Sequence, residues 1–155
     1  MSLAKQKLFV TCKKDDTLLI IDLVKLTVEK EIAIGRNPRG VAALPDGSQV
    51  FVACHDEAVV RRLSKYGKLD TFAVPPSPDR LVLRPDGKSV TVVNNEPGSP
   101  QLNALFPDTK ERSWWWVQLT DANNCTGLAY AEAEQRPIVI HQRPKTKIPD
   151  RKSVV

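Results

Sequence analysis

The chain carries one pattern of about forty residues more than once. Residues 35–54 read GRNPRGVAALPDGSQVFVAC, and residues 75–94 read PPSPDRLVLRPDGKSVTVVN. Aligned without a gap, the two stretches place Pro-Asp-Gly at the same point, with apolar residues on both sides. Residues 8–12 repeat the end of the pattern, and residues 124–141 carry a fainter copy. Self-similarity at this period is typical of solenoids and propellers.

The content of the repeat selects between these two architectures. In the first complete unit, short apolar runs at 40–44, 49–54, 58–63 and 69–74 are separated by turn residues. Runs of this length and composition predict strands. Pro-Asp-Gly between the first two predicts a tight turn, because Pro fixes φ and Gly accepts a positive φ. Four antiparallel strands per unit, without helical periodicity, predict an all-β chain built of β-propeller blades.

We expect a partial β-propeller of about three to four four-stranded blades over residues 1–142. The predicted division is an incomplete blade at 7–39, a full blade at 40–79, a longer full blade at 80–126, an incomplete blade at 127–142 and a basic C-terminal tail at 143–155. Propellers close their ring with about four to eight blades, so we expect the chain to be incomplete relative to a larger protein. Open blade edges predict self-association, or a protein partner that supplies the missing blades.

The repeat resembles a known family. The stretch DDTLLIIDLVKLTVEKEIAIGRNPRGVAALPDGSQVFVAC is similar to the YVTN-type, WD40-like β-propeller repeat, although the naming motif here reads FVTC, FVAC, TVVN and IVIH. The segment VIHQRPKTKIP also resembles a propeller stretch of large bacterial secreted proteins that carry a di-haem, cytochrome-c-peroxidase-like region. The resemblance implies a periplasmic or extracellular location for a full-length parent, while the chain itself shows no signal peptide and leaves its compartment open.

Charge and cysteine content argue against several classes of partner. The net charge is +5, and residues 136–155 alone carry six basic side chains and one acidic one, so the rest sums to zero. A nucleic-acid-binding domain needs a basic face on its folded part, so we expect no nucleic-acid partner. No apolar run is long enough for a membrane span. We expect no cofactor, because the chain has no CxxCH motif for c-type haem.

The cysteines are too dispersed for a metal site or a disulfide framework. Cys12, Cys54 and Cys125 lie far apart and show no zinc-type spacing. Cys12, Cys54 and His141 share one repeat position, but such positions in successive blades are separated by a blade's width, and zinc ligands must converge. We therefore expect no metal.

Blade geometry predicts where a binding site would lie. Loops before the first strand and after the second strand of each blade share one face, and the Pro-Asp-Gly turns lie on the other. Loops at one end of a rigid scaffold usually carry the binding residues. The predicted ligand- or partner-binding face comprises Arg36, Asn37, Arg39, His55, Asp56, Asp79, Arg80, Asn94, Asn95, Asn124, His141 and Arg143.

Two groups on this face have competing interpretations. Arg36 and Arg39 suit bidentate capture of a carboxylate or phosphate, but we favour ion pairs with acids of the next blade. His55, with Asp56 and Glu57 beside it, suggests a base with an orienting acid. No nucleophile motif accompanies it, and adjacent strand residues point to opposite faces. We interpret His55 as a loop histidine and expect no catalytic residue.

The aromatic run Trp114-Trp115-Trp116 predicts either core filling between blades or an exposed interaction surface, and both remain open. The function that we expect is a non-enzymatic binding or structural scaffold. One alternative is the propeller portion of a secreted redox protein with di-haem, cytochrome-c-like chemistry elsewhere. A lactonase-like propeller enzyme is a further alternative, because fold alone does not decide activity.

Overall fold

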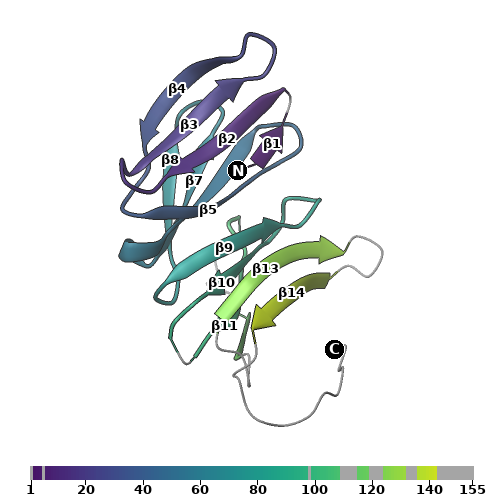
Figure 1. Ribbon diagram of the computed structural model, residues 1–155. Helices are drawn as coiled ribbons and strands as arrows, with labels where there is room; N and C mark the ends of the chain where they lie inside the picture. Colours follow the sequence, from purple (N-terminus) through teal and green to yellow (C-terminus); the bar gives the residue numbers. More distant parts are fainter. Residues whose placement is uncertain are drawn as a thin grey trace.

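The computed structural model describes the backbone of residues 2–4, 6–97, 99–108, 115–118, 124–131 and 136–142, and the side chains of 6–97 and 99–108. In these residues, regular structure is almost entirely β-strand, with one short 3-10 helix, η1 (His55–Glu57). The strands form three four-stranded antiparallel sheets and one two-stranded sheet, numbered 1 to 4 along the chain (Figure 1). The predicted all-β fold of repeated four-stranded units is confirmed.

Sheet 1 is more complete than the sequence analysis expected. Its strands lie side by side in chain order: β1 (Ser2–Ala4), β2 (Lys7–Cys12), β3 (Thr17–Asp22) and β4 (Thr27–Ala33). Our division began this blade at residue 7 and missed β1. Three residues with no apolar run give no strand signal of their own, and β1 is defined by its pairing with β2, where Leu3 lies opposite Leu8.

Sheet 2 matches the predicted strands to within two residues at each end. It contains β5 (Pro38–Ala43), β6 (Gln49–Cys54), β7 (Val59–Ser64) and β8 (Leu69–Ala73). The turn between β5 and β6 is closed by the N–H of Gly47, which donates to the carbonyl of Leu44 at 2.8 Å. Gly47 has φ 68°, and the matching Gly87 in sheet 3 has φ 72°, so both turns use the positive φ that the Pro-Asp-Gly pattern predicts.

Sheets 3 and 4 continue the repeat. Sheet 3 contains β9 (Pro78–Leu83), β10 (Val90–Asn94), β11 (Gln101–Leu105) and β12 (Trp115–Gln118), and sheet 4 contains β13 (Asn124–Ala131) and β14 (Arg136–Gln142). Trp114, the side chains of Trp115 and Trp116, and the predicted tail at 143–155 lie outside the described residues. The two interpretations of the tryptophan run therefore stay predictions.

Each sheet has two faces, which we call front and rear. The front face carries the residues that align with Val50 and Val52, and the rear face carries those that align with Phe51 and Ala53. The rear face of sheet 1 packs on the front face of sheet 2 in one buried cluster that includes Phe9, Leu18, Ile20, Val50, Val52 and Leu63. The rear face of sheet 2 packs on the front face of sheet 3 in a second cluster that includes Phe51, Ala53, Val60, Leu81, Val90 and Val92. Strand alternation thus lets one strand serve two interfaces.

The first strands of neighbouring sheets approach one another closely at the inner edge of the stack. β5 contacts β9 and also contacts β2 (Figure 1). A Cβ at Gly40 in β5 would lie 2.8 Å from the carbonyl oxygen of Asp79 and 3.0 Å from the Cα of Arg80. The neighbouring atoms are backbone, which cannot move aside without shifting β9. Glycine at position 40 is therefore required by the spacing of the two sheets.

We predict that Gly40→Ala lowers the free energy of unfolding by about 1–3 kcal/mol, the usual cost of overpacking. In the absence of a steric conflict the same change would stabilise the chain by about 0.4–1 kcal/mol, because alanine restricts the unfolded state. Urea denaturation measures whether the free energy of unfolding falls or rises. A stability equal to or above that of the unsubstituted chain would show that β5 and β9 do not approach as described.

Candidate functional site

The loops before the first strand and after the second strand meet on one face, as the sequence predicts. In sheet 2 the N–H of His55 donates to the carbonyl of Asn37 at 3.1 Å, and in sheet 3 the N–H of Asn95 donates to that of Ser77 at 2.9 Å. Asn37 and Ser77 occupy the same repeat position, and both have positive φ, 49° and 59°. The repeat therefore builds the same loop junction twice.

The last residue of the second strand ties this junction to the core. In sheet 2 the thiol of Cys54 donates to the carbonyl of Ile34 at 3.2 Å. In sheet 3 the amide of Asn94 donates to the carbonyls of Pro75 and Pro76 and accepts a 2.7 Å hydrogen bond from Asn103. Asn94 is 1% exposed. Its role is to hold the loop, so it is not available to a ligand.

The structure does not assemble the suggested acid–base pair. Nδ1 of His55 lies 3.2 Å from the carbonyl oxygen of Pro78 in the next sheet. Asp56 accepts a hydrogen bond from the amide of Asn37 at 2.9 Å, and Glu57 forms an ion pair with Arg61 at 2.7 Å. Both acids are engaged away from the imidazole. His55 therefore contacts a backbone carbonyl of the next sheet, and its interpretation as a loop histidine stays a prediction.

Arg36 and Arg39, proposed as a pair, have separate partners. Arg36 is 68% exposed, with Nε 3.8 Å from Glu57 in its own sheet. Arg39 crosses to sheet 3, where its Nη1 lies 2.8 Å from Oδ1 of Asp79. Oδ2 of Asp79 accepts a 2.8 Å hydrogen bond from the amide of Asn95. The ion pair between sheets that we favoured is therefore present at Arg39. Asp79 accepts from both Arg39 and Asn95 and so joins these side chains.

Around this ion pair lies a hollow of about 260 Å³, which we call the inner-edge hollow. It is lined by Lys13, Arg39, Gly40, Val41, Asp79, Arg80 and Leu81. These residues come from the β2–β3 turn and from the first strands of sheets 2 and 3. Our predicted set contained Arg39, Asp79 and Arg80 and left out Lys13, although the repeat places Lys13 on the same face; it missed Gly40. For Lys13 a signal was available, because it follows the second strand of its repeat and so belongs to the same face.

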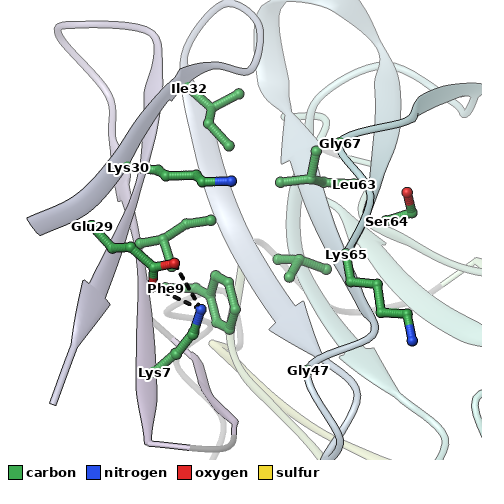
Figure 2. A pocket seen from close by; sticks show the side chains of 12 residues that line it. Lys7, Phe9, Glu29, Lys30, Ile32, Gly47, Leu63, Ser64, Lys65 and Gly67 are labelled. Atoms are coloured by element: carbon green, nitrogen blue, oxygen red, sulfur yellow. Dashed lines mark hydrogen bonds and ion pairs between the residues drawn. The ribbon is translucent and has the colours of Figure 1, made fainter. Parts of the chain in front are cut away.

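A second, smaller hollow of about 110 Å³ lies between sheets 1 and 2 on the opposite face, beside the turn glycines Gly47 and Gly67. We call it the turn-face pocket; Figure 2 shows Lys30 reaching across it and Lys7 paired with Glu29 at its rim. Its apolar residues are Phe9, Ile20, Ile32, Val50 and Leu63. The sequence analysis assigned no site to this face.

The remaining predicted site residues are placed by backbone alone or not at all. Asn124 lies in β13 opposite Gln142, and His141 lies in β14 opposite Cys125. Arg143 lies outside the described residues. Among residues whose side chains are described, no three His, Cys, Asp or Glu side chains gather as a metal site would require. Nor does the described part contain a helix long and apolar enough to cross a membrane.

Comparison with solved structures identifies proteins of similar fold. A chain of hydrazine synthase from Kuenenia stuttgartiensis superposes with a TM-score of 0.83 and 19% identity, covering 98% of this chain and 46% of that one. Virginiamycin B lyase from Staphylococcus aureus gives 0.69 and 13%, covering 87% and 45%. A streptogramin B lyase structure gives 0.70 and 12%, covering 87% and 44%.

These structures are β-propeller proteins, and the predicted fold class, a partial β-propeller, is confirmed. The chain spans less than half the length of each of them. No protein-family model matches the chain, and no curated protein sequence matches it either. At identities below one fifth, the similarity shows the fold and leaves the activity open.

We predict that Cys54 reacts with iodoacetamide far more slowly than Cys12 in the native protein. Burial raises the pKa of the Cys54 thiol from about 9 to about 11, and the side chain is fully buried, whereas Cys12 is half-buried. At pH 8 this shift leaves roughly a hundredth of the thiolate that an ordinary cysteine has. Peptide mapping by mass spectrometry measures both rates, and equal rates in the native protein would contradict the placement.

The raised pKa of Cys54 also makes the stability of the fold depend on pH. The folded state favours the neutral thiol of Cys54. This preference therefore contributes fully to the free energy of unfolding below the unfolded pKa near 9, and the contribution is lost as the pH rises toward 11. We expect the free energy of unfolding to fall over this interval, and to fall less in Cys54→Ala, as measured by urea denaturation. An unchanged pH slope in Cys54→Ala would contradict this assignment.

Proposed function

We propose that the chain is a non-enzymatic β-propeller segment that serves as a structural and binding scaffold. Its docking surface is the front face of sheet 1, and the partner is the rear face of another blade. The resemblance to YVTN-type repeats supports this proposal, because such repeats act as units of a ring. The single observation that carries it is a difference in burial among matched residues of the repeat.

That difference concerns the second strand of each sheet. Val50 and Val52 of sheet 2 are 3% and 0% exposed, because the rear face of sheet 1 covers them. Val90 of sheet 3 is 0% exposed beneath the rear face of sheet 2. The matched residues of sheet 1, Leu8 and Val10, are only half-buried. Within the part of the chain that the structure describes, no sheet covers them.

The exposed front face continues across sheet 1. Ile21 lies opposite Leu8, and Leu19 lies opposite Val10, so four apolar side chains form one patch on β2 and β3. Val28 of β4 lies opposite Ile21 and is 57% exposed. A contiguous apolar surface of this kind marks an interaction site. The rear faces of sheets 1 and 2, which carry Phe9 and Phe51 at the same repeat position, show the kind of surface that fits this patch.

A second copy of the chain offers such a rear face. In the repeat alignment, Ile138 and Ile140 of β14 take the positions of Phe51 and Ala53. Sheet 4 of one copy stacked on sheet 1 of another would repeat the packing found twice within the chain. This contact joins two different surfaces of the chain, so it is heterologous. Repeating it produces either a closed ring or an open assembly that continues to grow.

A second candidate function is that of the propeller portion of a larger enzyme. The similarity in fold to a hydrazine synthase chain and to virginiamycin B lyase, of each of which this chain covers less than half, favours it. In that case the chemistry belongs to the parent protein. Sequencing the coding region on both sides of this chain tests the candidate. Further forty-residue units with CxxCH motifs would support the secreted redox alternative, and a lone open reading frame would exclude it.

We predict that the chain self-associates in a concentration-dependent manner and that Val10→Asp shifts it toward the monomer, because a carboxylate is costly to bury in the contact. Sedimentation velocity over a wide concentration range measures the change. Val24→Asp is the matched control, since Val24 is 68% exposed in the turn between β3 and β4. A monomer at every concentration, or equal effects of the two substitutions, would contradict the proposal.

A further inference from the structure

We propose that the inner-edge hollow binds a small oxyanion, a phosphate or carboxylate group, through Lys13, Arg39 and Arg80. The hollow is built from sheets 1, 2 and 3 of one chain. The inference therefore goes beyond the docking of further blades and does not depend on it.

The charge of the hollow is the first argument. Three cationic side chains line it and one carboxylate, Asp79, faces them. Asp79 is already engaged, by Arg39 on Oδ1 and by Asn95 on Oδ2. One carboxylate cannot neutralise three cations, so the hollow keeps a positive charge that a bound anion would balance.

Two of the three cationic side chains, Arg80 and Lys13, have no carboxylate within hydrogen-bond distance among the described residues. Arg80 is 49% exposed, and its Nε lies 3.7 Å from Asp79, which is beyond hydrogen-bond distance. Lys13 forms no ion pair with any residue that the structure describes. By contrast, Arg61 and Arg62 are held by close carboxylates at 2.6 to 2.8 Å. Lys13 and Arg80 thus have fewer close carboxylate partners than Arg61 and Arg62.

Arg39 adds a directed donor. Its Nη1 donates to Asp79, while its Nε is buried without a hydrogen-bond partner. The ion pair fixes the plane of the Arg39 guanidinium and leaves its Nε–H without a hydrogen-bond acceptor. Buried donors without partners are rare and call for an explanation. A planar fork held in this way is suited to phosphate and carboxylate groups.

The walls of the hollow are rigid. Gly40 brings β5 against the backbone of β9, which fixes the positions of Arg39 and Arg80 on their strands. Val41 and Leu81, each 8% exposed, form its apolar base. Charged groups beside a partly apolar wall interact more strongly than they do in open water. Donor side chains that are already held in place lose less conformational freedom when an anion binds.

Isothermal titration calorimetry with inorganic phosphate and with citrate, in low-salt buffer, tests the site. We expect saturable binding of at least one of them, and a loss of about tenfold or more in affinity for the double variant Lys13→Gln, Arg80→Gln. Lys14→Gln is the control: it removes one positive charge next to Lys13, does not line the hollow, and is expected to leave the affinity within about twofold. The ratio of the two affinities shows which oxyanion the site selects.

Two results would overturn the proposal. The first is the absence of saturable binding of either anion by the unsubstituted chain. The second is an equal loss of affinity in the double variant and in Lys14→Gln, which would mean that the anions respond to general charge. Thermal unfolding of each variant without anion verifies folding, because all three substituted side chains are exposed and should leave the midpoint nearly unchanged.

Discussion

The stacking of the rear face of one sheet on the front face of the next is the interaction on which the rest of the structure depends. A strand presents alternate residues to its two sides, so Phe51 packs against sheet 3 while Val52 packs against sheet 1. A register slip of one residue would exchange the two sets. The distance between sheets is set at the inner edge, where Gly40 permits backbone contact with Asp79.

The loop face follows from this stacking. Once two sheets are fixed, the loop ahead of β5 and the start of β9 lie side by side, and Arg39 reaches Asp79 of the next repeat. The inner-edge hollow lies at this junction, where three cationic residues from different repeats and one carboxylate, Asp79, line the same space. The hollow is therefore a property of the assembled sheets, while residues that hold the loops, such as Cys54 and Asn94, are buried.

The sequence predicted those parts of the fold that depend on local pattern. The strand at 49–54 and the turn at Gly47 were recovered because alternation and Pro-Asp-Gly are local signals. β1 was missed because its strand character comes from pairing with β2. For the candidate site, repeat position placed Arg39 and Asp79 on one loop face, where they form an ion pair. It did not predict that Asn94 turns inward to the carbonyls of Pro75 and Pro76, because side-chain direction depends on tertiary contacts.

The most direct test of the account is hydroxyl-radical footprinting of the chain at low and high protein concentration. It reports the solvent access of side chains along β2 and β6, which occupy the same repeat position. The account predicts that residues 7–12 are modified at low concentration and become protected as the concentration rises. Residues 49–54, already covered by sheets 1 and 3, should stay protected throughout. Modification of 7–12 that does not change with concentration would contradict the claim that the front face of sheet 1 is an interface.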